Sequence, residues 1–134
     1  MKKEKKILFV EDEEAILHML ERAFSKAGYV VRVAKNAEKA IEILRQESIM
    51  VMFFDLHLPG KNGMELCEEV RKQNSVAVIY ALTGHVDLYS LLDCRKVGFE
   101  DFFTKPVNLD VLLEAARHAF EKIARWNVED FDLM

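Results

Sequence analysis

Five short runs of apolar, β-branched or aromatic residues recur along this chain, and they limit its possible folds more than any other feature. Each run has the length of a strand rather than of a helix. Segments with apolar residues at helical spacing lie between and after them, as in the series from Ile16 to Ala27. The runs cover residues 7–10, 29–33, 50–54, 76–82 and 101–103.

Local signals mark where the intervening helices begin and end. Asn36 and Asn108 stand where N-caps are wanted, and Gly28 stands where a helix would stop. Strands that are apolar on both faces and separated by helices predict a parallel sheet covered on both sides. We therefore expect an α/β fold: a doubly wound five-stranded parallel sheet in the order 2-1-3-4-5, which is flavodoxin-like. Its functional crevice should lie outside the carboxyl ends of strands 1 and 3.

Length and composition agree with one globular domain. The chain has 134 residues, of which 51% are hydrophobic and 31% charged. Its apolar runs are too short to cross a bilayer, and its basic start leads into no signal-peptide core. Cys67 and Cys94 form no metal or redox spacing. The net charge is −4, with no basic stripe. We expect a cytoplasmic protein that binds neither membrane nor nucleic acid directly.

Polar residues stand at the predicted carboxyl ends of four strands. Glu11 and Asp12 follow the first strand, Asp55 the third, Thr83 the fourth and Lys105 the fifth. Three carboxylates in one crevice repel one another unless a cation lies among them. Oxygen-only ligands suit Mg²⁺, which keeps room for a phosphoryl oxygen. The lysine and the threonine hydroxyl add donors for an anion.

Phosphate chemistry of an unusual kind follows from this set. The sequence has no GxxxxGK[ST] loop, and "VEDEE" after the first strand would repel a nucleotide phosphate. Asp55 is instead predicted to be a nucleophile that accepts a phosphoryl group as an acyl phosphate.

Four segments in order carry a family resemblance. "ILFVEDEE", "FFDLHLPGKNGMEL", "ALTGHVD" and "GFEDFFTKP" resemble the receiver domain of two-component response regulators, over roughly residues 5 to 124. The resemblance implies that Asp55 is the phosphoacceptor and that Thr83 and Lys105 contact the phosphoryl oxygens. It implies a Mg²⁺ site made by Glu11, Asp12, Asp55 and the backbone carbonyl of His57. Glu11 is often aspartate in the family, so this longer acid is a departure.

The resemblance also implies a switch. Thr83 would move toward the phosphoryl group and Phe102 would turn into the space that it leaves; tyrosine is common at that position, so ring burial alone must act here. Gly84 would keep the phosphoryl group accessible, and the peptide before Pro106 would be cis. His57 and His85 flank the predicted entrance, and we expect them either to modulate water access or to be ordinary loop histidines.

The implied partners are a sensor histidine kinase or phosphotransfer protein, and a downstream effector protein. The donor could also be a small phosphodonor. The signal would leave through the surface of about residues 86–124. We expect a receiver domain over residues 1–124, a C-terminal tail over 125–134, and a monomer or weak dimer. It would be a regulator that assists its own phosphorylation and dephosphorylation.

Three alternatives stay open. The chain could be a binding module that keeps the fold without phosphorylation, or a receiver cut from a longer regulator or hybrid kinase. A phosphohydrolase acting on external substrates is a third reading. Such enzymes commonly carry a second acid two residues after the nucleophile, where His57 stands here.

Overall fold

Strands and helices alternate along the whole described part of the chain. The computed structural model describes residues 4–85 and 88–126. The elements are β1 (Lys6–Val10), α1 (Glu14–Lys26), β2 (Val30–Ala34), α2 (Ala37–Gln46), β3 (Val51–Asp55), α3 (Gly63–Gln73), β4 (Val78–Thr83), α4 (Leu88–Val97), β5 (Asp101–Thr104) and α5 (Leu109–Arg125).

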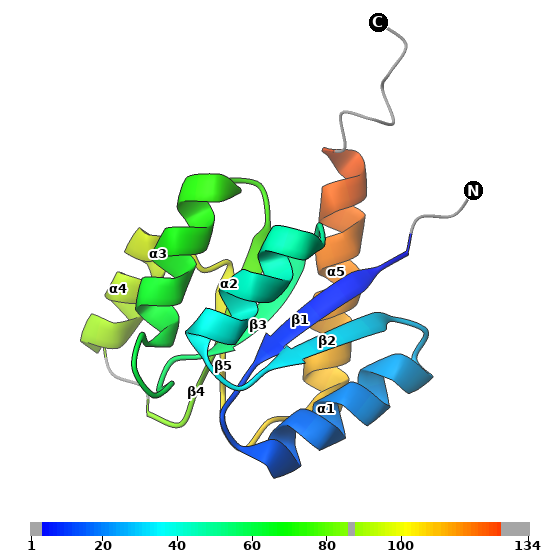
Figure 1. Cartoon of the computed structure of the whole chain (residues 1–134), viewed down its shortest axis with the longest axis horizontal. Coiled ribbons are helices and arrows are strands. Elements are labelled where there is room, and N and C mark those ends of the chain that lie inside the picture. Colours follow the sequence, from blue (N-terminus) through cyan, green and yellow to red (C-terminus); the bar gives the residue numbers. More distant parts are fainter. Residues whose placement is uncertain (1–3, 86–87, 127–134) are drawn as a thin grey trace, which may run out of the picture.

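The five strands form one parallel sheet in the order β2-β1-β3-β4-β5. The predicted doubly wound order is therefore confirmed. Helices α1 and α5 cover one face of the sheet, and α2, α3 and α4 cover the other (Figure 1). The chain reverses its winding between β1 and β3, so the carboxyl ends of these two strands border the crevice where such folds place their functional residues.

Each face of the sheet has its own hydrophobic core. The core under α1 and α5 is aromatic: the ring of Phe9 stacks on Phe53 at 5.1 Å and meets Phe24 edge-on at 4.8 Å. The core under α2, α3 and α4 is mainly aliphatic and contains two aromatic side chains, Phe54 and Phe99, which meet edge-on. Because all five residues of β3 are buried, its last residue, Asp55, is held rigidly by packing on both sides.

Asparagine side chains cap the N-termini of three of the helices. Asn36 and Asn108 accept hydrogen bonds from the backbone N–H groups of Lys39 and Val111, which confirms both predicted N-caps. Asn62 begins α3 in the same way and shares a reciprocal capping box with Glu65.

The fourth strand begins two residues later than the sequence predicts. Asn74 accepts hydrogen bonds from the N–H groups of Val76 and Ala77, so these residues close a turn after α3 instead of extending β4. Val76 is 67% exposed as a result. The other strand boundaries agree with prediction to within one residue at each end.

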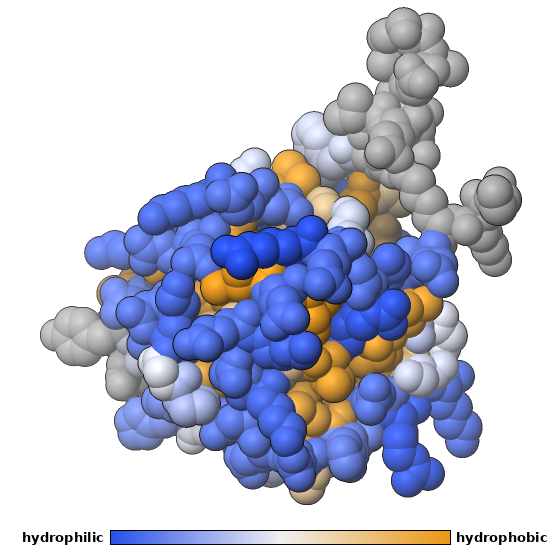
Figure 2. Space-filling model, viewed as in Figure 1, coloured by the Kyte–Doolittle hydropathy of each residue, from blue (hydrophilic) through white to orange (hydrophobic). Residues whose placement is uncertain are grey.

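The outer surface of α2 and α3 is largely hydrophilic, with apolar side chains visible in the gaps between elements (Figure 2). None of the helices within the described ranges is long and apolar enough to cross a membrane. Trp126, at the end of α5, is exposed. Most of the predicted tail, residues 127–134, lies outside the described residues.

Candidate functional site

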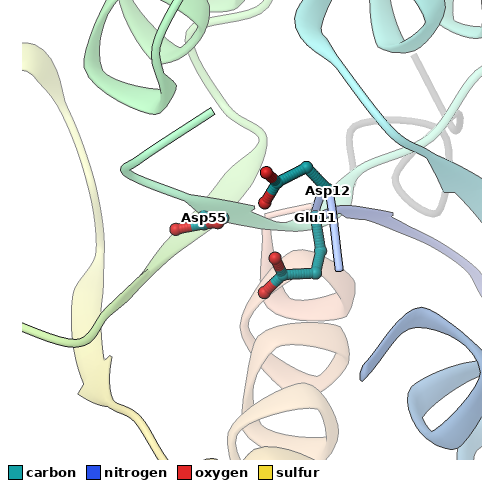
Figure 3. Close-up of side chains that lie close together, drawn as sticks. All are labelled: Glu11, Asp12 and Asp55. Atoms are coloured by element: carbon teal, nitrogen blue, oxygen red, sulfur yellow. The ribbon is translucent and has the colours of Figure 1, made fainter. Parts of the chain in front are cut away.

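The carboxyl ends of β1 and β3 bring three acids together. Glu11 and Asp12 follow β1, and Asp55 is the last residue of β3. Each offers a carboxylate oxygen within 4.8 Å of the others. Figure 3 shows the side chains of Glu11 and Asp12 reaching from the end of β1 toward Asp55. The sequence prediction that these three acids meet is therefore correct in geometry.

The three acids differ sharply in their exposure to water. Glu11 is fully buried and Asp55 is 2% exposed, whereas Asp12 is exposed. Burial disfavours the charged form of a carboxyl group. It raises the pKa of Glu11 to about 7; contacts with Lys105 and the backbone of Glu13 oppose this rise, and the neighbouring Asp55 adds to it. The buried Glu11 therefore holds its proton more tightly than an ordinary glutamate does.

Lys105 brings the only described ammonium group that contacts this acid cluster. Its Nζ lies 2.6 Å from Oε1 of Glu11 and 3.4 Å from Oδ2 of Asp55. Burial lowers the pKa of Lys105, but its contacts with Glu11 and Asp55 outweigh burial and leave the pKa raised. The Lys105 ammonium therefore stays charged beside the acids. The peptide between Lys105 and Pro106 is cis, as the resemblance implies.

The loop after β3 holds the backbone around Asp55. The N–H of His57 donates to Oδ1 of Asp55 at 3.0 Å, which is a local turn contact. Gly63, the first residue of α3, returns to donate its N–H to the carbonyl of Leu56. A β-carbon on Gly63 would lie 2.3 Å from the carbonyl oxygen of Asp55. Only glycine lets α3 begin so close to the acid.

Thr83 is the last residue of β4, and its hydroxyl bonds to the loop that follows this strand. The hydroxyl donates to the carbonyl of His85 at 2.8 Å and accepts from the N–H of His85 at 3.1 Å. The side chains of His57 and His85 are exposed, and both residues line a groove of about 450 Å³ that reaches Thr83. Of the residues predicted at the site, this groove is lined by Thr83 and the two histidines, and their position at its entrance stays a prediction.

The remaining predicted residues lie around this cluster. Phe102 is half-buried on β5 and packs against the core under α2, α3 and α4, paired with Ala81 of β4. Gly84 is exposed, with open space around its α-carbon. The sequence analysis missed Glu13, whose Oε1 lies 3.6 Å from Nζ of Lys105. Gly63 appeared there only within a quoted segment; the signal that could have singled it out is a glycine directly after Asn62, a residue type that begins helices.

The donor set fits a hard divalent cation. All three side chains offer oxygen, the ligand atom that Mg²⁺ prefers. The buried Oε1 of Glu11 has no hydrogen bond of good geometry among the described residues, although Nζ of Lys105 is near it. A buried acceptor left without an aligned donor is costly, and a cation can satisfy it.

Comparison with known sequences identifies the family. Residues 7–117 match the response regulator receiver domain. The chain is 32% identical over 113 residues to a cyclic di-GMP phosphodiesterase of Thermotoga maritima, covering 84% of this chain and 30% of that protein. It is also 32% identical over 107 residues to the uncharacterized transcriptional regulatory protein YrkP of Bacillus subtilis, covering 80% and 46%. The chain thus spans less than half the length of these two relatives.

Solved structures agree with this assignment. A CheY-like receiver domain protein from Methanospirillum hungatei superposes with a TM-score of 0.89 at 27% identity, over 93% of this chain and 100% of that one. The signal receiver domain of an HD domain-containing protein from Pseudomonas fluorescens gives 0.85 at 27%, over 90% and 97%. The family match, the strand order and the acids at the ends of β1 and β3 agree, and this chain belongs to the receiver domains of two-component response regulators.

Proposed function

We propose that this protein is a phosphoacceptor switch whose acceptor is Asp55. The observation that carries the proposal is the place of this carboxylate: it is buried at the end of β3, 3.4 Å from the ammonium of Lys105 and beside two further acids. A carboxylate oxygen of Asp55 attacks the phosphorus of the donor. The donor's bond to phosphorus breaks, its leaving group departs with the electron pair, and an acyl phosphate forms.

Two side chains are proposed to stabilise the transferred group. Lys105 is a point charge that can turn from the acids to a phosphoryl oxygen with little movement, because it already contacts Asp55. Thr83 can exchange its hydrogen bond to the His85 carbonyl for one to the phosphoryl group. Gly84 leaves the approach to the group open.

Mg²⁺ is the proposed cofactor. Glu11, Asp12, Asp55 and the backbone carbonyl of His57 would hold it, and when bound it neutralises charge on the phosphoryl oxygens. Glu11 must give up its proton to act as a ligand, so its raised pKa of about 7 favours Mg²⁺ binding as the pH rises above neutral. Asp12, being exposed, can serve through water.

The proposed output is a change in the surface of α4, β5 and α5. When Thr83 leaves His85, the loop between β4 and α4 loses two hydrogen bonds. Phe102 is half-buried on the neighbouring strand and can turn inward, with the burial of its ring biasing the switch. A tenfold shift in population needs about 1.4 kcal/mol, which partial burial of one ring can supply.

The proposed partners follow from this chemistry. The donor is a phosphohistidine on a sensor kinase or phosphotransfer protein, or a small phosphodonor, and the recipient of the signal is a separate effector protein. We further propose a cytoplasmic regulator that assists its own phosphorylation and dephosphorylation, a receiver domain over residues 1–124 followed by a tail, and a monomer or weak dimer. We propose no phosphodiesterase or transcriptional role for this chain; those activities appear only in the names of its two relatives.

The test is the mass of the intact protein after incubation with acetyl phosphate. We expect one phosphoryl adduct on the wild type with Mg²⁺, none with EDTA, and none on Asp55→Asn. Asp93→Asn, which changes an aspartate of α4 on the groove, is the matched control and should still be labelled. An adduct that persists on Asp55→Asn would contradict the acceptor assignment. A wild type that is labelled neither by acetyl phosphate nor by sensor kinases would favour a binding module that keeps the fold without the reaction.

A further inference from the structure

The residue that precedes α1, Glu13, lacks the side-chain cap that α2, α3 and α5 have. Glu13 occupies the N-cap position of α1, with extended backbone angles (φ −83°, ψ 110°), but its side chain makes no capping hydrogen bond. The helices α2, α3 and α5 all begin with an asparagine that does cap. A helix whose first residues lack a side-chain cap is less stable than a capped one. A residue that breaks a local rule of this kind is expected at a functional site.

The side chain of Glu13 turns to the site instead of to its own helix. Its Oε1 lies 3.6 Å from Nζ of Lys105, which is on the far side of the crevice after β5. Its backbone N–H donates to Oε2 of Glu11 at 3.2 Å. Glu13 therefore acts on the lysine directly and also orients the Glu11 carboxylate so that its other oxygen faces the same ammonium.

We propose that Glu13 is a positioning residue that holds Lys105 on the β1 side of the crevice and restrains its transfer to Asp55. The proposal rests on the proposed phosphoacceptor function. The ammonium is 2.6 Å from Glu11 and 3.4 Å from Asp55, so it already lies nearer to Glu11, on the β1 side, than to Asp55. Glu13 adds a second attraction on that side.

Glu13 also places a negative charge at the mouth of the site. Its side chain is 62% exposed, whereas that of Lys105 is 18% exposed. An anionic small phosphodonor approaching Asp55 meets this charge before it reaches the lysine. Both effects work in one direction: Glu13 slows phosphorylation by free anionic donors.

The kinetic test compares two neutralised acids that are adjacent in the chain. Glu13→Gln should raise the rate of labelling by acetyl phosphate about 3- to 10-fold. Glu14→Gln is the matched control, because Glu14 pairs with Lys35 and lies one residue further along; its rate should match that of the wild type. Added salt should accelerate the wild type more than Glu13→Gln. A rate that is unchanged or slower in Glu13→Gln overturns the proposal.

A second variant separates positioning from capping. Glu13→Ser should raise Tm by restoring a cap and should label as fast as Glu13→Gln; a Ser variant with the wild-type rate overturns the proposal. In EDTA, Glu13→Gln and Lys105→Met should have non-additive effects on Tm, and additive effects would refute the contact. This unfolding cycle needs no phosphoryl transfer. If the wild type accepts no phosphoryl group, the proposed function fails, while the cycle still decides whether Glu13 holds Lys105.

Discussion

Gly63 lies against the backbone of Asp55: a β-carbon on this glycine would come within 2.3 Å of the Asp55 carbonyl oxygen and 2.9 Å of the Leu56 α-carbon. Both clashing atoms belong to the backbone, so no side-chain rotation can relieve them. The start of α3 and the end of β3 are therefore fitted to each other at the proposed acceptor. The capping box of Asn62 and Glu65 holds the helix start in that place.

Gly63→Ala should destabilise the fold by about 2–4 kcal/mol, because overpacking against fixed backbone is costly. Urea unfolding at constant pH measures the change in the free energy of unfolding. Gly84→Ala is the matched control: its β-carbon would meet nothing within 4 Å, and its stability should stay within about 0.5 kcal/mol of the wild type. Equal effects of the two substitutions would contradict the close fit at Gly63.

The raised pKa of Glu11 predicts a pH-dependent stability in the metal-free protein. The ordinary pKa of a glutamate is 4.5, and burial raises that of Glu11 to about 7. The folded state then holds the proton more tightly than the unfolded state, so this contribution is full below about pH 4.5 and is lost as pH rises through 7. Glu11→Gln should be more stable than the wild type at pH 8 by about 1–3 kcal/mol, and similar to it at pH 5.

Urea unfolding in EDTA at both pH values measures this difference. Adding Mg²⁺ at pH 8 should stabilise the wild type and have little effect on Glu11→Gln, because a ligand that binds only the folded state raises its stability. A Glu11→Gln protein that is less stable than the wild type at pH 8 in EDTA would show that the ionised acid is favourable in the fold.

Arg71 fastens the far ends of α3 and α4 to each other. Its guanidinium donates to the carbonyl of Gly98 at the end of α4, and also to the carbonyl of Ala77 before β4. Lysine cannot reproduce this fork of donors. Arg71→Lys should cost about 2–3 kcal/mol in urea unfolding, since part-buried carbonyls lose their donors. The control is Lys72→Arg, at the neighbouring residue of α3, which should leave the free energy of unfolding unchanged. An unchanged free energy of unfolding in Arg71→Lys would contradict this role of the Arg71 hydrogen bonds.

His57 and His85 line the groove beside Thr83 and are predicted to limit the access of water to the acyl phosphate. Replacing both with alanine should accelerate loss of the phosphoryl group at least about 3-fold, because side-chain bulk that shields the acyl phosphate from attacking water is removed. Intact mass after removal of the donor gives the rate. His118→Ala, an exposed histidine of α5, is the control. An unchanged rate in the double variant would leave both as ordinary loop histidines.

Much of the fold and the composition of the site could be read from the sequence. The spacing of apolar residues in strands and helices is a local property, and so are the caps at Asn36 and Asn108. The order of the elements and the parallel sheet could therefore be predicted from the sequence. Parallel strands end at one edge of a sheet, which is why Glu11, Asp12 and Asp55 could be expected to meet.

The tertiary structure alone decided which groups touch and how each is directed. The preference of Lys105 for Glu11 over Asp55, the turning of Glu13 away from its own helix, and the bond of Thr83 to His85 all depend on side-chain directions set by packing. The burial that raises the pKa of Glu11 is likewise a property of the assembled core. Local sequence determines which chemistry stands at each strand end, but distances of a few ångströms between residues remote in the chain exist only once the layers have packed.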